Sequence, residues 1–317
     1  MLLKAFQLLN YKSFADSGKC SVQNGVTILA GQNESGKSNI LSALVKINDK
    51  EPIFAPNECS FNQTEDPPCI RYWFDLSPSE IDQLSNLLPG ARFSNEFVVE
   101  VRNKKREIQY DYEYEGEATE EERNKTLLPV LESLLPKFVL YQTLTNDIPD
   151  TFTAQDINKL PLKRLGTYLD ADFAKIFANK DQQQQHNATR RLSRTLSSDF
   201  AAKYKQKEVK LEFILNATTM SLYIHDKKPN QDDYGYAFQL SQRSTGLRWY
   251  LNFYIALKGE DLRPGDIILV DEPGMYLHPK AQQEMRCILN EESQNNQIIY
   301  TTHSPYLIDV DTLPAME

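Results

Sequence analysis

The stretch GQNESGKS, residues 31–38, decides how the rest of the chain is interpreted. Gly31 is followed by four residues and then by Gly36, Lys37 and Ser38, which is the spacing of a phosphate-binding P-loop. The two glycines let the backbone turn its N–H groups toward a polyphosphate. Lys37 is expected to reach the β and γ phosphates, and the Ser38 hydroxyl is expected to be a ligand of Mg²⁺.

The residues on either side support a P-loop. GVTILA, residues 25–30, is a short apolar run rich in β-formers, and SNILSALVKI, residues 38–47, repeats apolar residues at helical spacing. A loop between a strand and a helix N-terminus favours a bound anion. The residues expected to bind the nucleotide are Gly31, Asn33, Glu34, Ser35, Gly36, Lys37, Ser38 and Asn39.

Composition narrows the class of protein. At 317 residues the chain is long enough for one large or two ordinary domains. No run approaches eighteen apolar residues, and the N-terminus lacks the pattern of a signal peptide, so a cytoplasmic protein without a membrane partner is expected. The four scattered cysteines indicate neither a zinc site nor a disulfide framework.

The charge leaves DNA open as a partner. A formal net charge of −9 argues against a chain that coats nucleic acid along its whole surface. Two basic clusters stand out, RNKKRE at residues 102–107 and a run of arginines and lysines within residues 190–207. Solvated surfaces are the favoured interpretation of both, and local DNA contact is the alternative.

The order of the predicted elements suggests an α/β core with an insertion. Two or three strands lead to the P-loop, and further β-rich segments follow. The other predicted elements are a strand at 69–76, a hairpin within 97–116 around Asn103–Lys105, a helix at 118–134 and a strand at 137–144. Residues 155–206 have a polar, helical pattern, with two long helices expected after Pro161. Strands return at 209–225, and helix then alternates with strand, which is typical of parallel sheets covered by helices.

Two carboxylates follow a buried strand in IILVDEP, residues 267–273. Open α/β sheets bind ligands at the carboxyl ends of their strands. Because neighbouring side chains of a strand point to opposite sides, Asp271 and Glu272 are expected to have different roles. We expect Asp271 to hold Mg²⁺ through water or Ser38, and Glu272 to polarise the attacking water.

Two further stretches complete the candidate site. IIYTTHSP, residues 298–305, repeats the layout of a strand followed by polar residues, and His303 stands where a sensor of the γ-phosphate belongs. In LSQRSTGLRWYLNFYI, residues 240–255, Ser244 and Gly246 precede an amphipathic helix whose N-terminus is offered to an anion. A plain helix N-cap is the alternative for Ser244.

Taken together, these motifs resemble the ABC-type ATPase heads, specifically the branch that includes the SMC and RecF proteins and the OLD-family ATPases. Ser244, Thr245 and Gly246 are similar to the signature motif, with threonine in place of its first glycine. Asp271 and Glu272 resemble Walker B with its catalytic glutamate, and His303 resembles the switch histidine.

Three other segments belong to the resemblance, which covers about residues 1–145 and 208–310. NYKSF, residues 10–14, is similar to a turn common in this branch, which implies that Lys12 lies near the nucleotide. EPGMYLHPKAQ, residues 272–282, resembles the EPE-x-x-LHP segment of OLD proteins, with Gly274 in place of a residue that is often glutamate. Gln142 is the best candidate for the Q-loop glutamine near the metal, although a glutamine at a strand end is often simply polar.

The resemblance implies an α/β fold. We expect a P-loop NTPase of the ABC-ATPase head type, with an N-terminal β-rich subdomain and a mixed or parallel core sheet flanked by helices. The head is expected to span residues 1–317, with core lobes at about 1–145 and 208–317. Residues 146–207 are expected to form a helical insertion that serves as an arm or a dimerisation element.

The implied function is ATP binding and hydrolysis with Mg²⁺. In such heads two subunits pair head-to-tail, as a homodimer or within a higher oligomer, so that Ser244 and Gly246 act on the ATP of the other subunit. OLD proteins carry a TOPRIM nuclease module after the head, and nothing after LIDVDTLPAME supplies one. The expectation is a stand-alone head, one subunit of a split system or a truncated protein, driving a nuclease or other effector in phage defence or DNA repair.

Two alternatives remain. A nucleotide-binding subunit of a transporter is less favoured, because the signature follows the P-loop at a long interval and the LHP segment is not typical of transporters. A nucleotide-dependent switch that scaffolds a partner with little hydrolysis stays open, since Glu272 argues for hydrolysis without setting its rate.

Overall fold

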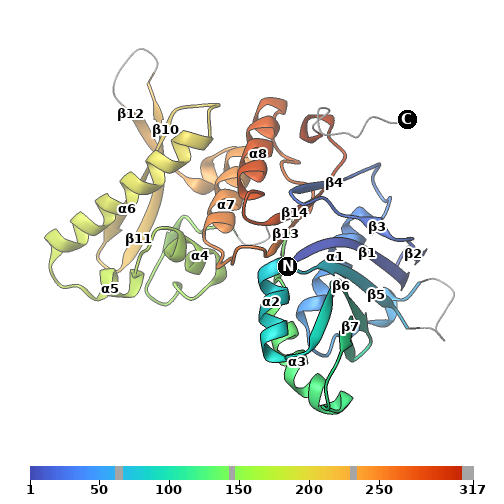
Figure 1. Cartoon of the computed structure of the whole chain (residues 1–317). Helices are drawn as coiled ribbons and strands as arrows, with labels where there is room; N and C mark the ends of the chain where they lie inside the picture. Colours follow the sequence, from blue (N-terminus) through green and yellow to red (C-terminus); the bar gives the residue numbers. More distant parts are fainter. Residues whose placement is uncertain (61–66, 143–146, 229–233, 309–317) are drawn as a thin grey trace. The chain divides into compact units, whose positions relative to one another are not determined.

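The computed structural model describes residues 1–60, 67–142, 147–228 and 234–308 (Figure 1). The chain divides into two compact units. The first contains residues 1–142, 263–272 and 289–308, and the second contains the described residues within 143–262 and 273–288. Over the described ranges, no helix combines the length and the apolar character needed to cross a membrane.

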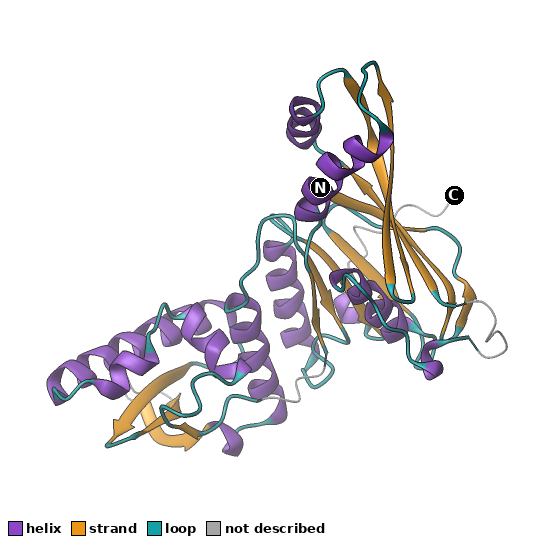
Figure 2. Cartoon of the chain, turned by 90° about the horizontal axis from the view of Figure 1, so that it is seen from below, coloured by secondary structure: helices purple, strands orange, loops and turns teal. Residues whose placement is uncertain are grey.

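An antiparallel sheet forms much of the first unit. Its strands are β1 (Leu2–Tyr11), β2 (Phe14–Asp16), β3 (Cys20–Ser21), β5 (Cys69–Asp75), β6 (Ala91–Arg102) and β7 (Lys105–Tyr114). They run in the order β2-β1-β5-β6-β7, with β3 paired to β1, and Figure 2 shows the twist of the long strands. Ile70, Tyr72 and Phe74, at alternate positions of β5, are fully buried, as expected of a sheet with one face packed on a core.

The hairpin predicted around Asn103–Lys105 is confirmed. Arg102 pairs with Lys105 across a two-residue turn in which Lys104 has a φ of 60°. The opening of the chain holds four strands rather than two or three, because β2 and β3 are only three and two residues long and leave no hydropathy period to detect.

A helix in the first unit was not predicted. It is α2 (Pro78–Leu87), and its start has a clear local cause. Ser77 and Glu80 form a capping box, and Pro78 occupies the first helical position. These residues are adjacent in the sequence, so this signal was available before the structure.

The second sheet of the first unit is wholly parallel and supports the site. It contains β4 (Val26–Ala30), β14 (Gln297–Thr302), β13 (Ile267–Val270) and β8 (Phe138–Tyr141), in that order. Every residue of β13 and β14 is buried, as in parallel sheets covered on both faces. The predicted α/β fold with a parallel core sheet is confirmed.

Helix α1 (Lys37–Leu44) joins the P-loop to this core. Leu41 and Leu44 belong to the same hydrophobic cluster as Tyr72 of the antiparallel sheet and Leu269 of the parallel sheet. The Tyr72 hydroxyl lies 3.1 and 3.2 Å from the carbonyl oxygens of Ala43 and Leu44. These contacts hold the C-terminal end of α1, which η1 (Val45–Asn48) follows, against the core. The unit also contains α3 (Glu120–Leu134).

The second unit combines a small antiparallel sheet with helices. The strands are β9 (Thr151–Phe152), β10 (Val209–Asn216), β11 (Thr219–Lys227) and β12 (Tyr234–Gln239), and the helices are α4 (Leu160–Tyr168), α5 (Phe173–Ala178), α6 (Gln182–Lys203), η3 (Leu240–Gln242) and α7 (Thr245–Lys258). The helix α8 (Pro279–Glu292) begins in this unit. The strand order is β10-β11-β12, with β9 also paired to β11.

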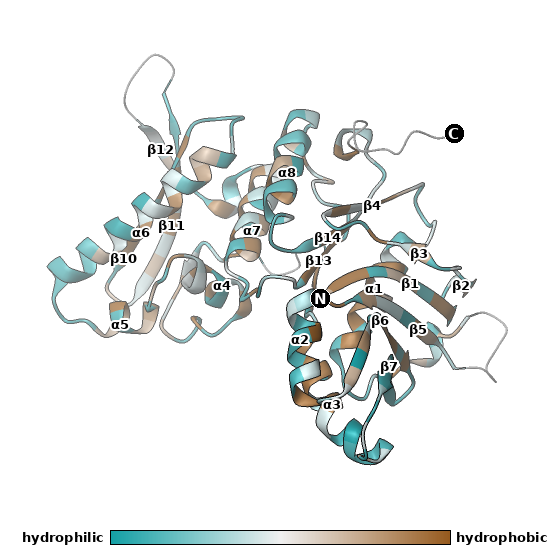
Figure 3. Cartoon of the chain, in the orientation of Figure 1, coloured by the Kyte–Doolittle hydropathy of each residue, from teal (hydrophilic) through white to brown (hydrophobic). Residues whose placement is uncertain are grey.

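Helix α6 covers the edge strand β10. The Ser193 hydroxyl accepts the N–H of Phe213 at 2.8 Å, and the Ser197 hydroxyl accepts the N–H of Leu211 at 2.6 Å. These hydroxyls accept N–H groups of β10 that would otherwise lack a partner at the edge of the sheet. Most of α6 is hydrophilic, in agreement with its sequence (Figure 3).

The expectation of two long helices after Pro161 is wrong. Residues 160–203 form three helices, of which only α6 is long, because Asp172 and Asp181 each cap a new helix start. Helices α4, α5 and α6 share one compact unit with β10, β11 and β12. The division into core lobes at about 1–145 and 208–317 and an insertion at 146–207 stays a prediction. The insertion as an arm or dimerisation element stays a prediction.

Candidate functional site

Four parallel strands of the first unit end at one edge, and the predicted site residues follow these ends. β4, β14, β13 and β8 are hydrogen-bonded neighbours in the same direction. Their carboxyl ends therefore meet. The residues that come next are Gly31–Ser38, His303, Asp271 with Glu272, and Gln142.

The P-loop turns through left-handed backbone to begin α1. Gly36, the N-cap of α1, has a φ of 89°, and Glu34 has a φ of 64°. A Cβ added to Gly36 would lie 2.9 Å from the Ser13 hydroxyl and 3.0 Å from the Phe14 ring. Both the backbone angle and the available space therefore require glycine at this position.

Lys37 lies folded against its own loop. Its Nζ donates hydrogen bonds to the carbonyl oxygens of Gly31 at 2.9 Å and Gln32 at 2.7 Å. The same nitrogen lies 3.8 Å from Glu272 Oε1, and the lysine side chain is only 10% exposed. The loop thus concentrates one positive charge at a helix N-terminus, where a phosphate is favoured.

Ser38 and Asp271 meet directly, although 233 positions separate them in the sequence. The Ser38 hydroxyl donates to Asp271 Oδ1 at 2.8 Å. The Thr301 hydroxyl donates to the same oxygen at 2.7 Å and accepts the backbone N–H of Glu272 at 2.8 Å. The Asp271 N–H in turn donates to the Tyr141 carbonyl at 2.8 Å, which continues the sheet pairing.

Glu272 and His303 form the second contact of the site. Glu272 Oε2 lies 2.8 Å from His303 Nδ1, and it also accepts the His303 N–H at 3.3 Å. The glutamate side chain is 18% exposed and the histidine side chain is 45% exposed. The pair is therefore open to solvent mainly on the histidine side.

Asp271 and Glu272 point in different directions, but strand alternation is not the reason. β13 ends at Val270, and Glu272 has a left-handed φ of 49°. This conformation costs about 1–3 kcal/mol for a residue other than glycine and is often found at functional sites. The turn separates the carboxylates, so that one reaches Ser38 and the other reaches Lys37 and His303.

The oxygen donors fit a magnesium ion. Ser38 and Asp271 offer a hydroxyl and a carboxylate, the hard ligands that Mg²⁺ prefers. Within the described ranges, no group of three His, Cys, Asp or Glu side chains forms a protein metal cage. A Mg²⁺ ion here would take its remaining ligands from phosphate and water, which is its usual mode in nucleotide sites.

The NYKSF turn borders the P-loop, but Lys12 is directed further along α1. Its Nζ donates to the Ser42 hydroxyl at 3.2 Å, one helical turn beyond Ser38. Ser13 makes the contact with the loop end, since Asn39 Nδ2 donates to its hydroxyl at 3.2 Å. Burial raises the pKa of the neighbouring Tyr11 well above its usual value, so this hydroxyl stays protonated.

The remaining predicted residues of the first unit lie at the surface of the site. Asn33, Glu34 and Ser35 are exposed on the loop. Gln142 is exposed directly after β8, beside the strand that carries Asp271. Its assignment to the Q-loop and its role as a metal ligand both stay predictions.

The signature-like segment lies in the second unit. Ser244 is the N-cap of α7, and its hydroxyl accepts the N–H of Leu247 at 3.4 Å. A Cβ on Gly246 would lie 2.9 Å from the Tyr276 carbonyl oxygen, so the helix start packs closely on the segment after Walker B. Arg248 pairs with Asp147 at 2.5 Å. The N-cap interpretation of Ser244 is confirmed, and its part in binding ATP stays a prediction.

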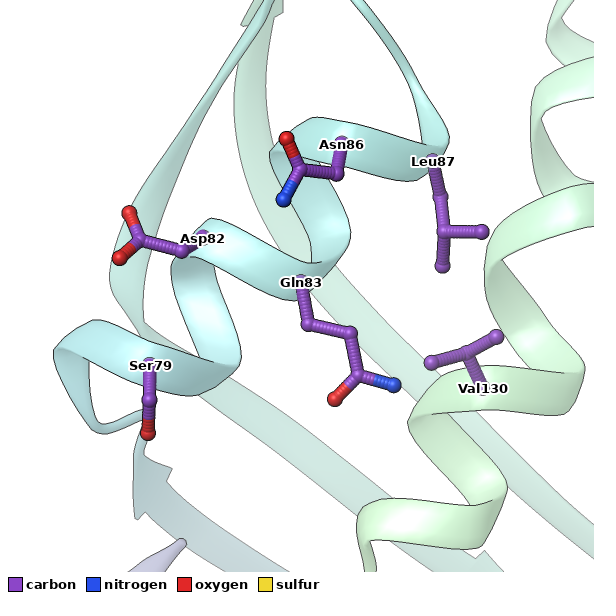
Figure 4. Close-up of a pocket in the computed structure, with 6 residues that line it drawn as sticks. All are labelled: Ser79, Asp82, Gln83, Asn86, Leu87 and Val130. Atoms are coloured by element: carbon purple, nitrogen blue, oxygen red, sulfur yellow. The ribbon is translucent and has the colours of Figure 1, made fainter.

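A separate concavity between α2 and α3 differs from this site in chemistry (Figure 4). Its volume is about 530 Å³, and its lining consists of Ser79, Asp82, Gln83, Asn86, Leu87 and Val130. The lining includes a carboxylate and no basic side chain. It is therefore not suited to a phosphate.

Sequence reasoning missed Thr301 and Ser13. Both lie in stretches already singled out, but Thr301 looked like an ordinary β-branched strand residue. Its hydroxyl at the end of a strand was the available signal. Ser13 adjoins Lys12, the residue of NYKSF that the family resemblance implied to lie near the nucleotide.

Comparison with curated proteins gives short matches. The chain is 43% identical over 51 residues to the OLD nuclease of Thermus scotoductus, covering 16% of this chain and 10% of that protein. It is 46% identical over 43 residues to the chromosome partition protein Smc of Rhodopirellula baltica, covering 14% and 4%. An uncharacterized protein of Methanocaldococcus jannaschii is 29% identical over 121 residues, covering 37% and 31%. The matches thus span less than a third of each relative's length.

Comparison with solved structures shows the fold. The chain resembles an SMC head bound to the C-winged helix domain of ScpA, with a TM-score of 0.53 and 18% identity over 97% of this chain and 91% of that chain. It also resembles the Smc head domain with an extended coiled coil bound to the C-terminal domain of ScpA, from Pyrococcus furiosus, with a TM-score of 0.51 and 16% identity over 96% and 90%.

These comparisons confirm the resemblance to the SMC and RecF-like branch of ABC-type ATPase heads, near the OLD ATPases. The fold is that of a P-loop ATPase head. A family model described as the AAA ATPase domain matches residues 1–308, and the chain therefore belongs to that family.

Proposed function

We propose that this protein binds ATP with Mg²⁺ at the P-loop and hydrolyses it. One observation carries the proposal: Ser38 donates to Asp271 at 2.8 Å while Glu272, the next residue, lies 2.8 Å from His303. Both acids follow the end of a β-strand beside the P-loop. Asp271, which is bonded to Ser38, is suited to binding the metal, and Glu272, which lies beside His303, is suited to activating water.

Each residue has a defined part in this proposal. Lys37 neutralises the β and γ phosphates, and Ser38 and Asp271 hold the metal. Glu272 polarises the attacking water, and His303 orients Glu272 and senses the γ-phosphate. The bound Mg²⁺ supplies charge neutralisation on the phosphate oxygens.

A phosphate-release assay tests the hydrolysis. Wild-type protein should release phosphate from ATP in Mg²⁺ and stop when excess EDTA is added. Asp271→Asn should need more Mg²⁺ for half-maximal rate, because the neutral amide lacks the negative charge with which the carboxylate would bind the metal. Glu121→Gln, on the exposed start of α3, is the matched control and should behave as wild type. Mg²⁺-independent release would contradict the proposed metal site.

The proposal extends to head-to-tail dimerisation in the cytoplasm. ATP on the P-loop of one subunit would be closed over by Ser244 and Gly246 of the other. The exposed start of α7 supports this, because a helix N-terminus with a serine cap offers donors to a γ-phosphate. The SMC head structures that share the fold are complexes with a partner protein, and we infer an effector partner for this chain also.

We infer that this effector acts on DNA and is a nuclease domain or subunit. The support is the local identity to an OLD nuclease and to Smc. Phosphate release with and without linear DNA tests it, and stimulation by DNA is expected. If ATP binding and dimerisation occur without measurable turnover, the nucleotide-dependent switch is the better description.

A further inference from the structure

We propose that Thr301 is a positioning residue for hydrolysis, which joins the metal-binding acid to the backbone of the water-activating acid. This inference rests on the proposed function and adds to it a residue to which the motif analysis assigned no role. Thr301 lies near the end of β14, and its side chain is fully buried.

The Thr301 hydroxyl uses both its donor and an acceptor. It donates to Asp271 Oδ1 at 2.7 Å and accepts the Glu272 N–H at 2.8 Å. A hydroxyl has one proton to donate and two lone pairs, so both bonds form at once. Because the hydroxyl is fully buried, its removal takes one donor from Asp271 and the acceptor from the Glu272 N–H.

The bond to Glu272 matters because of the backbone there. Glu272 follows the last residue of β13 and turns left-handed at a φ of 49°. Its N–H therefore donates to the Thr301 side-chain hydroxyl and not to a backbone carbonyl of a neighbouring strand. This turn directs the carboxylate toward His303 and Lys37, so Thr301 acts on the orientation of Glu272 without touching its carboxylate.

The bond to Asp271 matters for the metal. Asp271 Oδ1 accepts from both Ser38 and Thr301. If Ser38 and Asp271 held a metal ion, Thr301 would remain as the donor that fixes the Asp271 carboxylate. Residues that orient a metal ligand in this way commonly change metal affinity by 10- to 100-fold when they are removed.

The neighbouring Thr302 offers a matched control. It is on the same strand and is also fully buried. Its hydroxyl accepts the N–H of Ser304 at 3.0 Å and has no bond to either acid. Replacing either threonine with valine removes one buried hydroxyl at nearly constant volume, so general effects on packing should be alike in the two variants.

The experiment measures ATP hydrolysis and calorimetric ATP binding across a range of Mg²⁺ concentrations. Thr301→Val should lower kcat by about 10- to 100-fold and raise the half-saturating Mg²⁺ concentration by about 10-fold. Its ATP affinity in EDTA should stay within about twofold of wild type. Thr301→Ser keeps the hydroxyl and should restore most of the rate. Thr302→Val should keep the Mg²⁺ dependence of wild type.

Three results would overturn the inference: wild-type kcat and Mg²⁺ dependence in Thr301→Val, an equal change in Thr302→Val, or no rescue by serine. If valine at position 301 prevents folding, Thr301→Ala carries the same expectation. The proposed hydrolysis can fail separately. If wild type releases no phosphate, the Mg²⁺ dependence of ATP binding in Thr301→Val still decides the role of Thr301.

Discussion

Lys37 Nζ and Glu272 Oε1 lie 3.8 Å apart, so the P-loop lysine and the carboxylate expected to polarise water form an ion pair. Lys37 is also bonded to two carbonyl oxygens of its loop, and Glu272 is bonded to His303. The phosphate-binding charge and the proposed catalytic acid therefore belong to one connected network. A phosphate that engages Lys37 competes directly with its contact to Glu272.

Replacement of Lys37 should remove ATP binding. Lys37→Ala deletes the charge that faces the β and γ phosphates, and the affinity for ATP should fall by about 100-fold or more, about 3 kcal/mol. Lys12→Ala is the comparison, and its effect should stay within about 10-fold because its Nζ binds Ser42 one turn away. Titration calorimetry measures both, and retained ATP affinity in Lys37→Ala would rule out the P-loop interpretation.

Replacement of Glu272 should separate binding from chemistry. Glu272→Gln keeps size and hydrogen bonding but loses the charge that polarises water, so the rate of hydrolysis should fall by about 10²-fold or more. Lys37, Ser38 and Asp271 are unchanged, and ATP affinity should stay close to that of wild type. Single-turnover kinetics with calorimetry measure the two quantities. A full hydrolysis rate would exclude Glu272 as the base.

Blocked hydrolysis should also trap the dimer. A ligand that binds only the associated state draws the equilibrium toward it, so Glu272→Gln should become a larger species in ATP and Mg²⁺. Size-exclusion chromatography with light scattering measures this. A constitutive dimer would hide the change, and cross-linking between cysteines engineered near Ser38 and Ser244 addresses that case. The exposed Cys287 should first be replaced by serine. If ATP alters neither size nor cross-linking, the head-to-tail arrangement is wrong.

Mixed variants test whether the signature acts on the opposite subunit. Lys37→Ala and Ser244→Arg should each be inactive alone, because one lacks the P-loop charge and the other blocks the start of α7. Their mixture should regain about one working site per heterodimer, formed from the intact P-loop of one chain and the intact Ser244 of the other. Phosphate release by the mixture measures this. A mixture without activity would indicate sites built within single chains.

Glu100 should make the stability of the first unit depend on pH. It is 5% exposed, and one of its oxygens accepts from Cys69 at 3.0 Å, Arg102 at 2.7 Å and Arg71 at 3.1 Å. Burial raises its pKa, but these hydrogen bonds together outweigh burial and leave the pKa below its usual value. The folded state therefore holds the Glu100 proton less tightly than the unfolded state does, and this stabilisation is present at neutral pH and lost as pH falls through the folded pKa.

Glu100→Gln should lower the free energy of unfolding by about 2 kcal/mol at pH 7, and the difference from wild type should shrink toward pH 3. Glu107→Gln is the control. Glu107 faces Glu100 across the β6–β7 pair, and its ion pair in the described residues is with the exposed Lys105. Its replacement should therefore lower the free energy of unfolding by less than about 1 kcal/mol. Urea denaturation at the two pH values measures both. An equal loss of unfolding free energy in Glu100→Gln and Glu107→Gln would show that the hydrogen bonds of Glu100 add no particular stability.

The features of the site that the sequence predicted are those built from adjacent residues. The spacing of Gly31, Gly36, Lys37 and Ser38 is local, and a strand before it and a helix after it follow from hydropathy alone. The acids after IILV and the histidine after IIYTT were found for the same reason. Short strands such as β2 and β3, and the breaks between α4, α5 and α6, depend on pairing and capping contacts that periodicity does not register.

By itself, the sequence determined that this chain has a P-loop, two buried strands that end in polar residues, and a capped helix at Ser244. Only the tertiary structure decided that β14 lies between β4 and β13. That order brings the Thr301 hydroxyl to both Asp271 and Glu272. Tertiary packing likewise directed Lys12 to Ser42. The physical reason is that strand order and side-chain direction arise from contacts between residues far apart in the chain, which no local pattern encodes.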